Sequence, residues 1–94
     1  VMYQEMSFNT VGLNENTRIK FSIQPNPAKD EIEIRHFENG PLDVQIIDMQ
    51  GRVVYQGTIG QPSNVIDLQR LTPGVYQVIL SNEKTYSAQK LLVL

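Results

Sequence analysis

The stretch FSIQPNPAKDEIEI, residues 21–34, marks where regular structure begins in this 94-residue chain. Its second half, from Glu31 to Ile34, alternates glutamate and isoleucine, a period of two that is typical of a strand with one buried face. Its first half places a proline on each side of Asn26. Residues before proline favour extended conformations, so we expect this segment to lead the chain stiffly into a β-structure. We also expect the Asn26 side chain to bond its own backbone in an Asx turn.

The same alternation recurs further along the chain, at residues 42–46 and 76–80. About seven short apolar stretches are separated by turn signals, whereas no window of helical length has apolar residues at three-and-four spacing. The pattern predicts an all-β fold, a sandwich of about seven mainly antiparallel strands between residues 20 and 94. Five residues are predicted to lie in its core: Ile34, Val44, Ile46, Tyr76 and Val78.

Two turn signals predict how the strands connect. In DMQGRVVY, Asp48 suits the first position of a type I turn, and Gly51 supplies the left-handed residue that closes a bulged hairpin. In LTPGVY, Pro73 fixes one central residue, and Gly74 provides the positive φ that a type II turn needs next.

The first part of the chain differs from the rest. Residues 1–18 hold scattered apolar residues and then the polar, turn-rich NENTR. We interpret residues 1–19 as a linker or a trailing segment of a preceding domain, and residues 20–94 as the folded domain. The start at Val1 shows no secretory signal and suggests a fragment of a longer precursor, and no apolar run is long enough to span a membrane.

Composition excludes several classes of function. Eight lysine and arginine residues stand against ten aspartate and glutamate residues, a net charge of -2, which argues against a nucleic-acid partner. The chain has no cysteine, so disulfides and thiolate metal sites are excluded.

Residues that could carry catalysis are few and scattered. His36 is the only histidine, no serine has a nucleophile-elbow context, and no glycine-rich phosphate loop is present. Asp30, Glu31 and Glu33 could bind calcium, but Glu31 and Glu33 share a strand face with Arg35, which is typical of a solvated face. We therefore expect no catalytic residue, no metal and no cofactor, and we expect that the chain is not an enzyme.

Four sequence pieces in order resemble one known family. IQPNPAKDEIEI, VQIIDMQGRVV, IDLQRLTPGVYQVIL and QKLLVL are similar to the C-terminal sorting domain of the type IX secretion system of Bacteroidetes (the type A Por secretion tail), over residues 21–94. The resemblance implies four sorting motifs and an immunoglobulin-like sandwich. These motifs would comprise Pro25, Asn26 and Pro27, then Asp48 and Gly51, then Gly74 and Tyr76, and finally Lys90.

The resemblance implies that the domain acts as an export signal. Such a domain would follow a covalently fused cargo domain into the periplasm of a Gram-negative bacterium and direct it through the outer-membrane translocon. Sortase-like machinery would then cut within residues 1–20, which would leave the cargo secreted or on the cell surface. A second reading is a non-catalytic immunoglobulin-like or fibronectin-like accessory module of a secreted surface protein, a spacer or a carbohydrate-binding unit, because LTPGVY is similar to the tyrosine corner of those folds.

Overall fold

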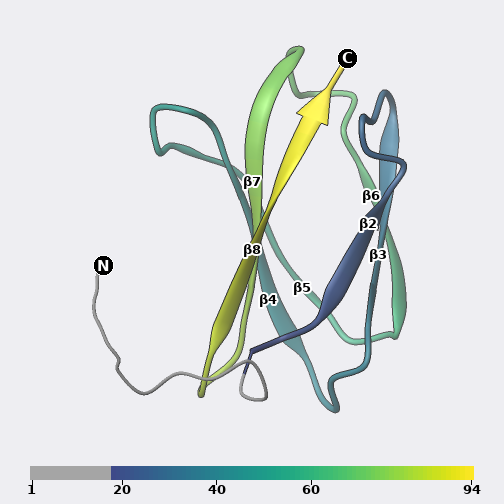
Figure 1. Cartoon of the computed structure of the whole chain (residues 1–94), viewed down its shortest axis with the longest axis vertical. Coiled ribbons are helices and arrows are strands. Elements are labelled where there is room, and N and C mark those ends of the chain that lie inside the picture. The colour runs from purple at the N-terminus through teal and green to yellow at the C-terminus, as the bar shows by residue number, and fades with distance from the viewer. Residues whose placement is uncertain (1–17) are drawn as a thin grey trace.

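The computed structural model describes residues 18–94, which form two antiparallel sheets packed against each other (Figure 1). The three-stranded sheet has the order β2 (Phe21–Gln24), β3 (Glu31–His36), β6 (Ser63–Asp67). The four-stranded sheet has the order β5 (Val53–Ile59), β4 (Leu42–Ile47), β7 (Gly74–Ser81), β8 (Tyr86–Val93). The seven described strands confirm the predicted all-β, immunoglobulin-like sandwich. The described residues include no helix that could span a membrane.

The core lies between the sheets and follows the period-two pattern of the sequence. Every second residue of β3, of β4 and of β7 from Tyr76 onward is buried, because successive side chains of a strand point to opposite faces of its sheet. The five core residues predicted from the sequence are all buried: Ile34, Val44, Ile46, Tyr76 and Val78. Burial of this apolar surface is the main favourable contribution to folding.

Ile19 also belongs to this core, with only 3% of its surface exposed. It lies one residue before the predicted start of the folded domain, so the packed unit includes it. The division at residues 19 and 20 stays a prediction, since residues 1–17 lie outside the described part of the chain.

The strands run up and down the sandwich, so the loops that connect them lie at its two ends. β2, β4, β6 and β8 run toward one end, and β3, β5 and β7 start there (Figure 1). We call this the motif end, made of residues 25–30, 48–52, 68–74 and 90–94. All four sequence pieces that carry the family resemblance contribute to it.

Candidate recognition site at one end of the sandwich

The segment around Asn26 forms hydrogen bonds with β8, the last strand. The Asn26 Nδ2 group donates to the carbonyl of Lys90 at 2.8 Å, and the Leu92 amide donates to Asn26 Oδ1 at 3.1 Å. Ala28 continues the pairing, because its amide donates to the Leu92 carbonyl at 2.7 Å and its carbonyl accepts from the Leu94 amide at 2.8 Å. We call this the clasp, residues 26–28. It occupies the free edge of β8 and forms a parallel bridge between Ala28 and Val93.

The clasp corrects two expectations for the Pro-Asn-Pro segment. Asn26 bonds the backbone of β8 and not its own backbone, so the expected Asx turn is wrong. The segment also does not lead the chain into the sandwich, because β2 precedes it and already pairs with β3. Both peptide bonds before Pro25 and Pro27 are cis.

The Asp48 hairpin forms as the sequence predicts. The Gly51 amide donates to the Asp48 carbonyl at 3.0 Å, and Gly51 has a φ of +84° in the left-handed region. Ile46 pairs with Tyr55 whereas Ile47 pairs with Val53, so β5 carries one extra residue at Val54. This is the register slip of a β-bulge.

The Asp48 carboxylate organises this hairpin from inside. Its Oδ1 accepts from the amides of Gln50 and Arg52, both at 2.9 Å, and its Oδ2 accepts from Arg52 Nε at 2.8 Å. Only 13% of the Asp48 side chain is exposed. The hydrogen bond from the Arg52 amide, together with the one from its guanidinium, lowers the pKa of Asp48. The carboxylate therefore stays ionised at neutral pH and holds Arg52 in place, and Arg52 Nη2 also donates to Gln50 at 3.1 Å.

Tyr76 fixes the turn before β7. Its hydroxyl donates to the Thr72 carbonyl at 2.6 Å and lies 3.3 Å from the Thr72 hydroxyl. A tyrosine that bonds the backbone four residues upstream is the tyrosine corner of immunoglobulin-like folds. Gly74 has the positive φ that the sequence predicts, +159°. The expected type II turn is wrong, since Gly74 is the first residue of β7 and its φ is far from the roughly +80° of such a turn. The backbone bond between Leu71 and the Leu68 carbonyl, 2.9 Å long, closes the turn three residues earlier.

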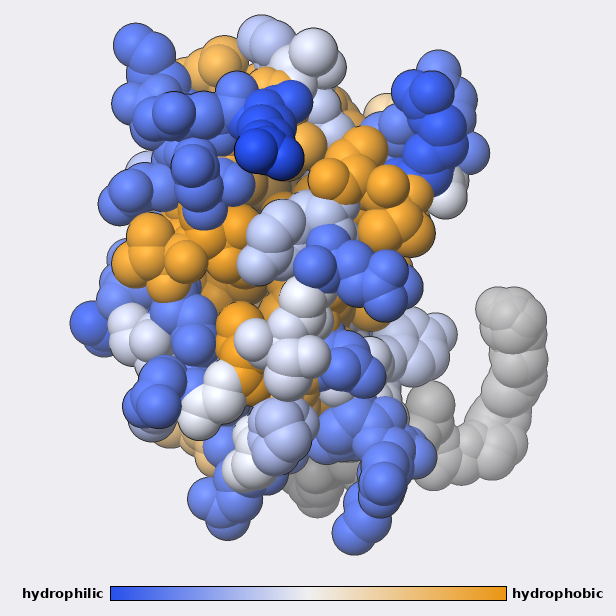
Figure 2. Space-filling view, turned by 180° about the vertical axis from the view of Figure 1, so that it is seen from behind, coloured by the Kyte–Doolittle hydropathy of each residue, from blue (hydrophilic) through white to orange (hydrophobic). Residues whose placement is uncertain are grey.

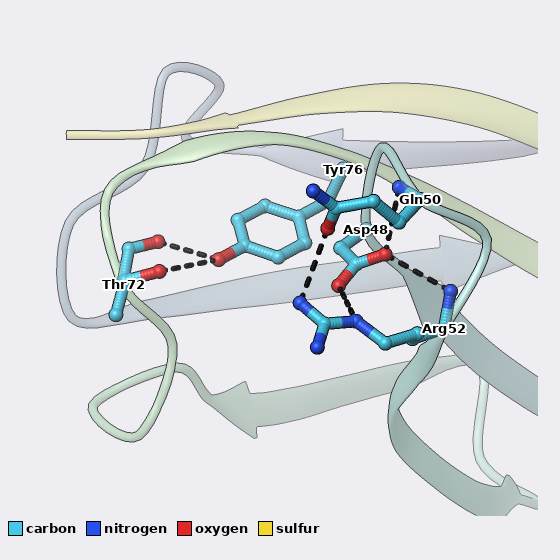
Figure 3. A network of polar contacts seen from close by, with 5 residues as sticks. All are labelled: Asp48, Gln50, Arg52, Thr72 and Tyr76. Atoms are coloured by element: carbon cyan, nitrogen blue, oxygen red, sulfur yellow. Dashed lines mark hydrogen bonds and ion pairs between the residues drawn. The ribbon is translucent and has the colours of Figure 1, made fainter.

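The hairpin and the tyrosine corner face each other across a shallow groove of about 470 Å³ (Figure 3). Residues from both turns line it, including Asp48, Arg52, Arg70 and Tyr76. The second and third sequence motifs therefore form one surface. We call it the turn groove, and its full lining comprises residues 48–50, 52, 54 and 70–76.

Lys90 has two separate roles in the geometry. Its carbonyl accepts from the clasp, whereas its exposed side chain lies on the outer face of the four-stranded sheet, opposite Gln77 of β7. The neighbouring residue, Leu91, points into the core and is fully buried. The Lys90 side chain is thus an exposed positive charge on β8, the strand whose backbone Asn26 hydrogen-bonds.

Two of the remaining candidate residues, His36 and Glu33, lie outside the motif end. His36 is 2% exposed, its Nδ1 accepts from the Glu38 amide at 3.1 Å, and its Nε2 has no partner among the described residues. Glu33 accepts hydrogen bonds from Ser63 and Gln24 and pairs with Arg35, and the Ser63 bond above all lowers its pKa. Between residues 18 and 94, no three histidine, aspartate or glutamate side chains are grouped as metal ligands would be.

The sequence interpretation missed three residues of this end. Ala28 is fully buried and completes the clasp, whereas Arg52 and Arg70 line the turn groove. The alternation of DEIEI starts only after Ala28, so no local pattern marks that residue as part of a sheet. An arginine four residues after a turn aspartate is a signal for Arg52, since a short hairpin brings the two side chains together.

Comparisons with known proteins agree with this architecture. The family model described as the secretion system C-terminal sorting domain matches residues 22–94. A solved structure of PorZ, a surface component of the type IX secretion system of Porphyromonas gingivalis, is similar with a TM-score of 0.62 and 23% identity. That match covers 79% of this chain and 11% of the PorZ chain, so this chain spans a small part of PorZ and the similarity shows the fold alone. A search of curated proteins found no match.

The fold and its clasped last strand define an immunoglobulin-like β-sandwich module. The chain belongs to the family of secretion system C-terminal sorting domains. Domains of this family are the sorting signals of type IX secretion cargo, and that is the function of this chain. Such a signal implies interaction with the secretion machinery and export of the protein that carries it.

Proposed function

We propose that the motif end is the surface that the type IX machinery reads when this domain directs its fused cargo through the outer-membrane translocon. The observation that supports this most is the clasp, in which Asn26 bonds the backbone of Lys90 and Leu92. Two motifs that lie at opposite ends of the domain sequence thereby become one folded surface. On this proposal the machinery recognises a folded surface of the domain and not a linear peptide.

The later steps of the route form the second part of the proposal. The cargo would pass through the periplasm, and a sortase-like protease would cut within residues 1–20, which would leave the cargo secreted or on the surface of a Gram-negative cell. The domain itself would carry no catalysis. The burial of His36 supports this, because the residue is 2% exposed and its Nδ1 accepts from the Glu38 amide, as a structural histidine does.

A reporter experiment tests the proposal. A periplasm-targeted fluorescent protein is fused to residues 1–94 and produced in a bacterium with a working type IX system, and in the same strain without its translocon. The reporter should reach the surface or medium only in the first strain, with the domain removed. Equal export from both strains, or periplasmic retention in both, would contradict the proposed route.

A further inference from the structure

The turn groove has an apolar lining that is open to solvent. Met49 is 76% exposed and Val54 is 38% exposed, and the half-buried Leu71 and Val75 also line the groove. Figure 2 shows hydrophobic surface directly beside the protruding hairpin, at the upper right of that view. Exposed apolar side chains that gather around one depression mark a contact surface more often than single exposed residues do.

The charges around this lining have mainly one sign. Asp48 is the only carboxylate among the groove residues, and Arg52 neutralises it at 2.8 Å. Arg70 is exposed and forms no ion pair within residues 18–94. The groove therefore presents a free cation beside an apolar surface, in a chain whose overall charge is -2.

We propose that the turn groove binds a segment of the secretion machinery that presents aliphatic side chains next to a carboxylate. The carboxylate would pair with Arg70, and the aliphatic groups would cover Met49 and Val54. This inference rests on the proposed function and adds the place and the chemistry of the contact. Charge complementarity of this kind favours encounter with the right partner and disfavours wrong ones.

Two other occupants fit less well. A second copy that used the same groove in a two-fold contact would bring the two Arg70 side chains together, which like-charge repulsion opposes. A strand added along β5 would need a regular edge, but the bulge at Val54 disturbs the backbone there. We therefore place the contact on the side chains of the groove.

The test uses the exported reporter with single changes inside the groove and matched changes outside it. Val54→Glu introduces a negative charge on the apolar lining, and Val65→Glu is its control, at an exposed valine of β6 in the other sheet. Arg70→Glu reverses the free cation, and Lys84→Glu is its control at the opposite end of the sandwich. Arg70→Lys keeps the charge.

We expect Val54→Glu and Arg70→Glu to lower export about tenfold or more, whereas both controls stay within about twofold of the wild type. Arg70→Lys should lower export less than Arg70→Glu does, because it keeps the positive charge. The purified variants should melt within a few degrees of the wild type. Met49→Glu, at an exposed turn position, repeats the test if Val54→Glu proves unstable.

Three outcomes would overturn the inference. Normal export of the groove variants beside an exported wild type would remove the groove from recognition and leave the sorting function intact. Equal losses in groove variants and controls would show that the effect is not specific to this surface. A wild-type dimer in sedimentation equilibrium that Val54→Glu dissociates would assign the groove to a second copy. Failure of the wild-type reporter to export would instead reject the proposed function itself.

Discussion

The Leu92 amide donates a hydrogen bond to the side chain of Asn26 at 3.1 Å, across 66 residues of sequence. With the bond from Asn26 to the Lys90 carbonyl, one side-chain amide takes the place of a neighbouring strand at the edge of β8. Edge strands are liable to pair with other chains, and native proteins often cover them. The clasp therefore both closes this edge and fixes the position of the last motif.

Replacement of Asn26 tests how much the clasp stabilises the fold. Asn26→Ala removes both side-chain bonds to β8, so we expect a loss of about 1–2 kcal/mol in the free energy of unfolding, measured in urea. The control is Asn39→Ala, at an exposed loop position, which should change the value by less than about 0.5 kcal/mol. Equal values for the two variants would show that the clasp contributes nothing measurable.

The tyrosine corner gives a second test of stability. Tyr76→Phe keeps the buried ring but leaves the Thr72 carbonyl without its hydroxyl donor, so we expect a cost of about 1–2 kcal/mol. Tyr86→Phe removes the same hydroxyl from a residue that is 63% exposed and should have almost no effect. Thermal melts followed by circular dichroism distinguish the two variants. An unchanged melting temperature for Tyr76→Phe would contradict a structural role for this hydrogen bond.

Local sequence chemistry predicted the core and one of the two turns. The alternation of apolar and polar residues predicted the buried faces of β3 and β4, and the spacing of Asp48 and Gly51 predicted the hairpin. Both features depend on residues close in the chain. The LTPGVY segment was misread, since the pairing of Gly74 with Val93 in β7 and β8 overrides the turn preference of Pro-Gly.

The clasp could not be predicted from local patterns. Asn26 next to proline fits an Asx turn by propensity, and only the fold shows that the backbone of Leu92 lies within its reach. Likewise, Ile19 looks like part of a polar lead-in, yet it is buried because the two sheets close around it. Contacts between residues far apart in sequence decided both positions.

Gly51 carries the conformational requirement of the hairpin. Its φ of +84° disfavours any residue with a Cβ atom, although a Cβ there would meet no atom within 4 Å. Gly51→Ala should therefore cost about 1–2 kcal/mol through backbone strain alone. Gly60→Ala is the matched control, since Gly60 also has open space around it but no such φ. Urea unfolding should leave Gly60→Ala within about 0.5 kcal/mol of the wild type, and a similar loss in both variants would refute the assignment.

The Asp48 carboxylate predicts a pH dependence of stability. Its pKa is lowered in the folded state, so its contribution is fully present above the ordinary value of 3.8 and is lost as the pH falls through the folded pKa. Asp48→Asn should be less stable than the wild type at pH 7, and the difference should shrink below about pH 4. The control Asp30→Asn changes an exposed aspartate outside the hairpin. A difference that stays constant from pH 7 to pH 2 would contradict the prediction.

Lys90 allows the function of the last strand to be separated from its stability. The clasp bonds the Lys90 carbonyl, whereas the side chain is exposed, so Lys90→Ala should leave the melting temperature almost unchanged. If the machinery reads this cation at the motif end, the same change should reduce export of the fused reporter. Lys84→Ala, at an exposed lysine of the opposite end of the sandwich, is the control and should export normally. Deletion of residues 90–94 should retain the reporter in the periplasm, but it also removes the buried Leu91 and Val93, so misfolding could explain that result. Normal export by Lys90→Ala would therefore be decisive, because it would show that this side chain takes no part in recognition.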